Sequence, residues 1–302
     1  MSKKSVSGQP SIVFAEECDR GITREENQDS VLHVRIALGD LMIVADGMGG
    51  YAGGSTASRL VVENFYAHLA ALPDDYPVDN AIRGAAARAN AQIVAEANAP
   101  GSPFQHMGST VVVAVVQQKA DGTFAWIGHI GDSRAYLMRA GRLYRLTIDH
   151  SAVQALLSRN MITPEEAQNH PDASVLTRSL GHQPEVEIDI EEHPLAYGDT
   201  LLLCSDGLWG FVSELDIQKM VDAPGRTLES SAHGLLELAL TAGGKDNISI
   251  EMTRLVGPPI VEIPQHNPYA INHRTILWIV LTVFVMTFAV FCVLAYLVFW
   301  NN

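Results

Sequence analysis

Four times along this sequence, an apolar run typical of a buried β-strand meets an aspartate. Three runs lead into the aspartate and one follows it, and the four residues are Asp46, Asp132, Asp206 and Asp246. A buried strand fixes its end residues, so a carboxylate placed there leaves the core and stays rigidly held. One Asp-Gly pair alone would indicate an ordinary turn. Four such aspartates in one chain instead predict a cluster of carboxylates at the edge of a sheet.

Strands and helices alternate in the rest of the chain. Apolar residues recur at helical spacing over three runs that end in proline or glycine: 54–72, 78–99 and 227–242. Six runs rich in valine and isoleucine predict strands, namely 41–45, 110–116, 124–130, 133–138, 200–204 and 248–253. Asp121 and Gly122 join two of these runs as a hairpin, which requires antiparallel pairing. We expect a mixed fold in which helices cover antiparallel sheets.

Composition excludes several classes of protein. The 302 residues suffice for one large domain or two small ones. A net charge of −14 repels nucleic acid, so we expect no nucleic-acid partner. The three cysteines are far apart and form no CxxC pair, which argues against a disulfide framework or a zinc site and favours a reducing compartment.

The chain divides into four regions by composition. Residues 1–10 are polar and predict a flexible tail, 11–254 read as the globular domain, and 255–274 contain four prolines that suit an extended linker. Residues 275–300 carry no charge and would form a helix about 39 Å long, enough to cross a hydrocarbon layer of about 30 Å. A buried core helix is the alternative. We expect a single-pass protein of the cytoplasmic membrane whose globular domain, which no export signal precedes, lies in the cytoplasm.

Clustered aspartates need a counter-charge. Two carboxylates 4 Å apart repel each other by about 4 kcal/mol at an effective dielectric constant near 20. No matching set of lysines or arginines stands beside the four aspartates. Two hard divalent cations with oxygen ligands, Mg²⁺ or Mn²⁺, would neutralise them. Such a pair of ions activates water and polarises a phosphoryl oxygen, which is the chemistry of phosphoester hydrolysis.

Seven short segments, in order, carry a family resemblance: 24–29, 44–50, 107–110, 131–136, 177–181, 205–209 and 245–249. Together they resemble the metal-dependent (type 2C) protein phosphatases in their bacterial form, over about residues 11–254. The resemblance implies an α+β fold of two stacked antiparallel β-sheets flanked by helices, a four-layer α-β-β-α sandwich. It also implies a flap over about 149–181, in which short helices are expected at 152–160 and 164–168.

The resemblance assigns a metal role to each aspartate of the cluster. Asp46 would bridge two metal ions, and the backbone carbonyl of Gly47 would bind one of them. Asp206 and Asp246 would complete the ligands of the other ion, and Asp132 would hold a looser third ion together with Asp206. Catalysis would then depend on Asp46, Asp206 and Asp246 through the metals, with water as the nucleophile.

Substrate binding and the outer part of the site involve four further residues. The resemblance implies that Arg24 grips the substrate phosphate and that Asp29 supports metal-bound water. Some relatives have a histidine where this chain has Met48, so no general acid is assigned. Gln28 stands where some members have a glutamate, which leaves one outer metal contact open.

The sequence gives less support for a catalytic role of the histidines and serines near these motifs. His129 is expected to be a hydrogen-bonded strand residue rather than a ligand, whereas His150 opens the flap and could meet substrate. Ser133 and Ser205 flank aspartates, but no histidine is spaced to activate either one as a nucleophile.

These inferences predict a membrane-tethered enzyme that hydrolyses phosphoserine and phosphothreonine in proteins. Expected partners are a phosphorylated protein, such as a serine/threonine kinase or its targets at the membrane, and the lipid bilayer through 275–300. The alternatives are a non-catalytic, membrane-anchored module that binds phosphoproteins and a phosphoesterase that acts on small molecules.

Overall fold

The computed structural model of the chain describes residues 11–50, 53–168 and 170–257. The predicted tail at 1–10, most of the predicted linker and the predicted membrane helix at 275–300 lie outside these ranges. Within them, no helix is both long and apolar enough to span a bilayer.

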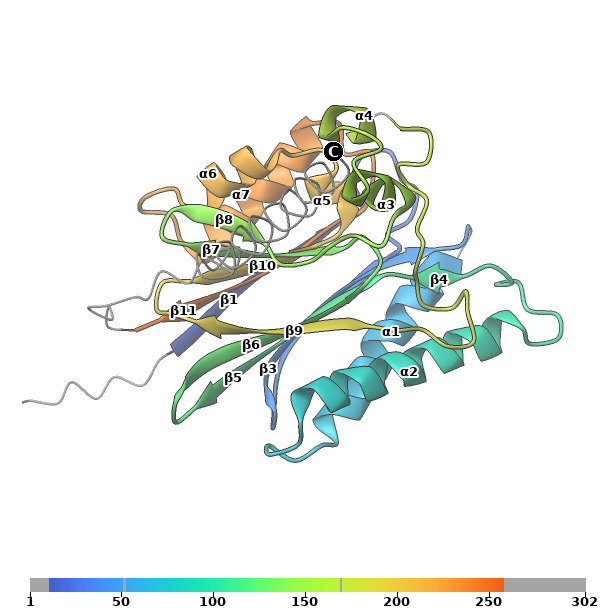
Figure 1. Cartoon of the computed structure of the whole chain (residues 1–302), viewed down its shortest axis with the longest axis horizontal. Coiled ribbons are helices and arrows are strands. Elements are labelled where there is room, and N and C mark those ends of the chain that lie inside the picture. The colour runs from blue at the N-terminus through green and yellow to red at the C-terminus, as the bar shows by residue number, and fades with distance from the viewer. Residues whose placement is uncertain (1–10, 51–52, 169, 258–302) are drawn as a thin grey trace, which may run out of the picture. The chain divides into compact units, whose positions relative to one another are not determined.

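Two antiparallel sheets form the centre of the described domain (Figure 1). The first sheet has the strand order β1 (Ser11–Asp19), β11 (Ile248–Val256), β10 (Thr200–Cys204), β7 (Arg134–Arg139) and β8 (Arg142–Arg145). The second has the order β2 (Asp29–Ile36), β3 (Gly39–Met48), β5 (Val111–Lys119), β6 (Gly122–Ile130) and β9 (Asp189–Leu195), and β4 (Gly108–Ser109) pairs with the end of β3.

Strand β3 shows why the two sheets stack. Its residues alternate between two cores, since successive side chains of a strand point to opposite faces. Met42 and Val44 pack against residues of the other sheet, such as Leu203. Leu41 and Ile43 pack against helices on the outer face. Both faces of β3 are therefore buried, which explains its unbroken apolar sequence.

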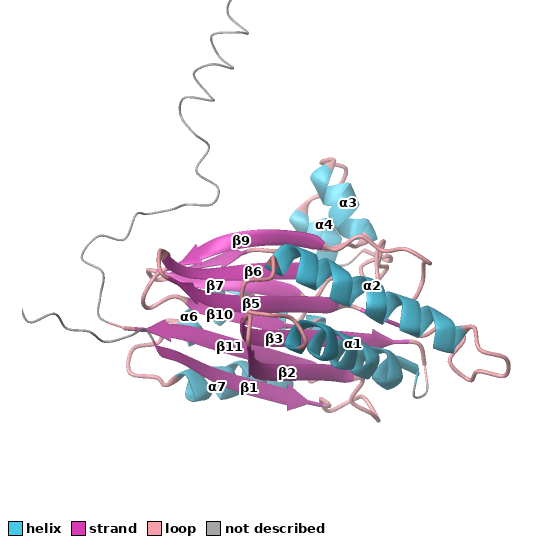
Figure 2. Cartoon of the chain, turned by 90° about the horizontal axis from the view of Figure 1, so that it is seen from below, coloured by secondary structure: helices cyan, strands magenta, loops and turns pink. Residues whose placement is uncertain are grey.

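Helices cover the outer face of each sheet (Figure 1), and Figure 2 shows α1 and α2 from the side that they cover. The long helices α1 (Gly53–Ala70) and α2 (Val78–Ala97) pack on the second sheet, while α5 (Asp206–Trp209), α6 (Glu214–Val221) and α7 (Leu228–Thr241) pack on the first. The domain is thus a four-layer α-β-β-α sandwich, as predicted.

The flap follows β8 of the first sheet and precedes β9 of the second sheet. It contains α3 (Ala152–Ser158) and α4 (Pro164–Gln168), close to the two short helices that the sequence predicted. The three long predicted helices and the six predicted strands also form, with ends that differ by a few residues. The predictions omitted β1, β2, β4, β8 and β9 among the strands and the short helices α5 and α6.

Candidate active site

A cavity of about 500 Å³ opens at one end of the sandwich. All four aspartates that the sequence singled out line it: Asp46, Asp132, Asp206 and Asp246. Arg24, the predicted phosphate-binding residue, also lines the cavity. So do Gln28 and Met48, the two residues that depart from the family pattern. The flap contributes Ser174 and Leu176 to the wall. The sequence prediction that the aspartates converge is therefore confirmed.

Each aspartate reaches the cavity from the end of a different element. Asp46 lies near the end of β3, and Asp206 is the first residue of α5, directly after β10. Asp132 lies in the turn from β6 to β7, and Asp246 precedes β11 by two residues. Because both sheets end at the same side of the sandwich, four segments far apart in sequence place their carboxylates around one space.

Burial makes these carboxylates hard to ionise. It raises the pKa of Asp46 and of Asp206 well above the usual range, and neighbouring carboxylates raise both further. Burial, followed by the charge of Asp149, raises the pKa of Asp132 to about 6. Acidic groups in this arrangement need positive charge if they are to be ionised together at neutral pH.

The carboxylate oxygens around the cavity suit divalent cations, as Asp206 shows. Its buried Oδ1 has no hydrogen-bond partner among the residues that the structure describes. An unpaired buried carboxylate oxygen is costly unless a cation or water takes the place of the missing partner. Several converging carboxylate oxygens, without histidine or cysteine, are the ligands that Mg²⁺ and Mn²⁺ prefer.

The backbone around Asp46 is fixed by Ser109 and Thr110, which lie in the 107–110 segment and had no predicted role. The Asp46 N–H donates to Thr110 Oγ1 over 3.0 Å, and the Thr110 N–H donates back to the Asp46 carbonyl over 2.8 Å. The Ser109 hydroxyl donates to the same carbonyl over 2.9 Å. Gly47 must be glycine, since a side chain there would collide with the Gly54 carbonyl. This frame holds the carboxylate of Asp46 and the carbonyl of Gly47 in place.

Asp29 lies behind the cavity and does not line it. It is the cross-strand partner of Asp46, and its Oδ2 accepts a 2.7 Å hydrogen bond from the Ser205 hydroxyl. Ser205 Oγ in turn accepts the Ser249 N–H over 3.0 Å. Burial raises the pKa of Asp29 to about 6. Ser205 thus links β2 to β11, and its hydroxyl proton is engaged by Asp29.

Arg24 brings a positive side chain to the cavity. Its Nη2 lies 2.7 Å from Asp246 Oδ2, and this hydrogen bond is the main reason that the pKa of Arg24 is raised. The side chain is 53% exposed. Arg24 therefore stays charged and can meet an anion that enters from solvent.

The two departures from the family pattern can be located. Met48 follows Gly47 at the cavity wall and carries no proton that it could donate. The side-chain amide of Gln28 is engaged by the backbone, since its Nε2 donates to the Gly50 carbonyl over 3.0 Å. Neither residue supplies an acid group to the cavity.

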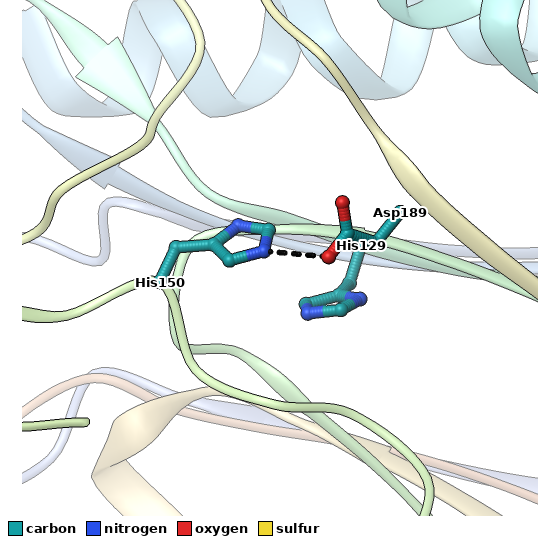
Figure 3. Close-up of side chains that lie close together, drawn as sticks. All are labelled: His129, His150 and Asp189. Carbon is teal, nitrogen blue, oxygen red and sulfur yellow. Dashed lines mark hydrogen bonds and ion pairs between the residues drawn. The ribbon is translucent and has the colours of Figure 1, made fainter. Parts of the chain in front are cut away.

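His129, His150 and Asp189 form a separate cluster at the base of the flap (Figure 3). Potential ligand atoms of the three lie within 4.8 Å of one another. However, His150 Nδ1 accepts the Gly131 N–H over 3.2 Å, which assigns the ring proton to Nε2, and Nε2 donates to Asp189 Oδ2 over 3.1 Å. Arg178 Nη1 lies 2.6 Å from Asp189 Oδ1 and already supplies the positive charge. The cluster is therefore a hydrogen-bonded junction and not a metal site.

His129 and His150 both make hydrogen bonds within the fold. His129 Nε2 hydrogen-bonds the Ile148 carbonyl over 2.9 Å, as expected for a hydrogen-bonded strand residue. His150 does not line the cavity. Burial, together with the nearby His129, lowers the pKa of His150, so that its ring is neutral at pH 7. It serves the flap junction rather than a substrate.

Known proteins share this fold and these motifs. Residues 22–239 match the family described as "Protein phosphatase 2C". The serine/threonine protein phosphatase PstP of Mycobacterium tuberculosis is 39% identical over 251 residues, which cover 80% of this chain and 45% of that protein, so the chain spans about half the length of this relative. The serine/threonine phosphatase stp of Listeria monocytogenes is 35% identical over 236 residues, 77% of this chain and 91% of that protein.

Solved structures agree with these sequence matches. A crystal structure of M. tuberculosis PstP/Ppp has a TM-score of 0.70 at 37% identity and covers 82% of this chain and 99% of that chain. The catalytic domain of PstP in complex with two manganese ions has a TM-score of 0.71 at 35% identity, covering 82% of this chain and 100% of that chain. On the evidence of its motifs, its fold and these relatives, the chain belongs to the protein phosphatase 2C family.

Proposed function

We propose that this protein is a metal-dependent serine/threonine protein phosphatase that is tethered to the cytoplasmic membrane. One observation carries the proposal: four aspartates and Arg24 line one cavity, and the buried Oδ1 of Asp206 has no partner among the described residues. The relatives named as serine/threonine phosphatases support the activity, and the two manganese ions of the PstP structure support the choice of metal.

The proposed metal centre uses the residues already described. Asp46 and the carbonyl of Gly47 would hold one ion, and Asp46, Asp206 and Asp246 the other, with Asp132 and Asp206 at a looser third position. When bound, Mn²⁺ or Mg²⁺ ions supply an activated water and stabilise charge on the phosphoryl group. Ser109 and Thr110 keep the Asp46 backbone in place, and Asp29 supports the site from behind.

Arg24 is the proposed phosphate-binding residue. A guanidinium can donate two parallel hydrogen bonds to a phosphate, which fixes the orientation of the group as well as its position. Arg24 is half exposed and points to the cavity that the aspartates line, so a phosphoserine or phosphothreonine side chain can reach it. Met48 offers no proton to the leaving oxygen, so no side chain is assigned as the general acid.

Turnover of p-nitrophenyl phosphate and of a phosphothreonine peptide by the full chain in detergent tests the proposed activity. We expect hydrolysis that requires Mn²⁺ or Mg²⁺ and stops when a chelator is added. Peptide binding without any turnover would instead support the non-catalytic module, and turnover of small phosphoesters but never of phosphopeptides would support the small-molecule phosphoesterase.

The tether is proposed from the uncharged run at 275–300, which lies outside the described residues. Fractionation of cells that produce the full chain should place it in the membrane pellet, resistant to carbonate extraction. A chain that ends at residue 257 should be found in the supernatant and should turn over p-nitrophenyl phosphate at the same rate. Recovery of the full chain in the supernatant would contradict the proposed membrane tether but not the proposed activity.

A further inference from the structure

The segment that carries Arg24, residues 20–28, joins β1 to β2 without a helix or strand of its own. It is held against residues 244–247, which precede β11. The backbone N–H groups of Ile22 and Thr23 both donate to the Gly244 carbonyl, over 2.8 and 3.1 Å. Gly21 has φ +75° and packs so closely on the Asp246 carbonyl that a side chain would collide with it.

Asn247 contributes the most specific of these contacts. Its Nδ2 donates to the carbonyls of Arg20 and Glu26, both over 2.9 Å, and its Oδ1 accepts the Gln28 N–H over 2.8 Å. The residue is only 6% exposed. An asparagine side chain offers two donors and an acceptor at this reach, whereas aspartate at neutral pH has no donor and serine is too short.

These three bonds bracket Arg24 from both sides. Arg20 is anchored before it, and Glu26 and Gln28 are anchored after it. The Arg24 side chain is 53% exposed, so its own packing restricts it little. Besides its ion pair with Asp246, its direction toward the cavity therefore depends on the backbone of the segment, and the hydrogen bonds of Asn247 hold that backbone on both sides of Arg24.

We propose that Asn247 is a positioning residue, which fixes the 20–28 segment so that the guanidinium of Arg24 meets the substrate phosphate. The proposal rests on the function proposed above and adds a determinant of phosphate affinity that acts through Arg24. Asn247 follows Asp246 directly, so one short segment supplies a carboxylate to the cavity and also sets the position of the phosphate-binding arginine.

Asn90 offers a matched control elsewhere in the fold. This α2 residue is 2% exposed, its Nδ2 donates to the carbonyls of Gln183 and Pro184 over 2.8 and 3.1 Å, and its Oδ1 accepts the Gly181 N–H over 2.8 Å. Asn90→Ala removes the same three kinds of hydrogen bond as Asn247→Ala without touching the segment that carries Arg24. The two variants should lose similar thermal stability.

Kinetics of the full chain in detergent at saturating Mn²⁺ test the role of Asn247. Asn247→Ala should raise KM for p-nitrophenyl phosphate and the inhibition constant of inorganic phosphate by about tenfold, with kcat changed by less than about threefold. The Mn²⁺ concentration for half-maximal activity should stay unchanged. Asn90→Ala should leave KM and the inhibition constant at the wild-type values.

A double mutant separates this role from general support of the site. If Asn247 acts through Arg24, Asn247→Ala should raise KM no further in the Arg24→Ala background, because the two changes remove the same interaction. An equal increase of KM in both backgrounds would overturn the proposal. So would a higher Mn²⁺ requirement with unchanged KM, which would mean that Asn247 supports Asp246 instead.

Two further measurements keep the test decisive. If Asn247→Ala does not fold, Asn247→Asp retains the volume and the acceptor but loses both donors, and an unchanged KM in this variant would refute the proposal. If the wild-type chain shows no turnover, the proposed function fails, and calorimetric titration with inorganic phosphate still compares the wild type with the variants. Equal phosphate affinity of wild type and Asn247→Ala would then refute the role of Asn247.

Discussion

Carboxylates with raised pKa values destabilise the fold when they ionise at neutral pH, and they occur in two different places in this protein. Asp46 and Asp206 face the cavity, where cations would compensate them. Glu251 lies on β11 opposite Glu16, on the face turned toward the other sheet, since Ile250 and Met252 face the helices. Burial raises the pKa of Glu251 to about 10, and the adjacent carboxyl of Glu16 raises it further.

We expect Asp206→Asn to change activity and stability in opposite directions. Turnover should be lost, since the amide removes the charge of a proposed metal ligand. Stability without metal should rise at pH 7, because burial raises the pKa of Asp206 above its unfolded value and ionisation therefore favours unfolding. Turnover with Mn²⁺ and thermal melting in a chelator measure the two effects. A variant that is inactive and also less stable in chelator would contradict this account.

We expect Glu251→Gln to stabilise the protein. The folded pKa of about 10 exceeds the unfolded value of 4.5, so the stability that this carboxyl contributes is full below pH 4.5 and is lost as the pH rises toward 10. The gain should be on the order of 3 kcal/mol at pH 7, larger at pH 9 and absent at pH 4.

Urea denaturation at these three pH values measures the gain from Glu251→Gln. Glu192→Gln, an exposed substitution on β9, is the control and should change stability by less than about 0.5 kcal/mol. A gain that does not depend on pH would show that packing, and not ionisation, limits the stability at residue 251.

Among the elements, the flap is attached at both ends to one residue of β9. Asp189 accepts a hydrogen bond from His150 at the start of the flap and one from Arg178 near its end. The Thr177 N–H also donates to the His150 carbonyl over 2.8 Å, so the two ends are joined to each other. Because Ser174 and Leu176 line the cavity just before the second end, this junction sets the position of the cavity wall.

We expect His150→Ala to loosen the flap. The change removes the hydrogen bonds to Gly131 and Asp189 and should cost about 2 kcal/mol of stability. Limited proteolysis should then cut between residues 151 and 176 about tenfold faster than in the wild type, because local opening becomes easier. His233→Ala removes a histidine that pairs with Glu17 on the surface and should leave flap cleavage unchanged.

For the domain as a whole, metal binding and folding should be coupled. The cavity carboxylates are costly without cations, and a ligand that binds only the folded state stabilises it by about 4 kcal/mol at 1,000 times its dissociation constant. We expect saturating Mn²⁺ to raise the melting temperature by several degrees and a chelator to reverse the rise. Asp132→Asn should reduce the rise less than Asp206→Asn, and equal losses would contradict the looser role of Asp132.

Removal of metal should also reverse the pH dependence of stability. Burial raises the pKa of Asp29 and of Asp132 to about 6, so without metal the folded state gains stability as the pH falls from 7 to 5. With saturating Mn²⁺, acid should instead destabilise the fold, because protons compete with the ions for the carboxylates. Melting curves at both pH values, with Mn²⁺ and with chelator, check this change of sign.

Local pattern was enough to predict much of this protein. Strands with two buried faces and long helices show their apolar pattern in the local sequence, whichever elements they pack against. For this reason β3, β10 and α1 could be placed within a few residues. The four aspartates were predictable for the same reason, since a buried strand delivers its last residue to the sheet end. The edge strand β1 escaped prediction because most of its side chains are exposed or half-buried and show no apolar alternation.

Only the tertiary structure decided which distant residues meet. Asn247 lies about 220 residues from the carbonyls that it holds, and His150 about 40 from Asp189, so no local spacing links them. Hydrogen bonds are satisfied by whichever donors and acceptors the packed sheets bring together, and a side chain alone does not specify that partner. The sequence by itself therefore determined the carboxylate cluster, while packing of the two sheets decided what holds Arg24 and the flap in place around it.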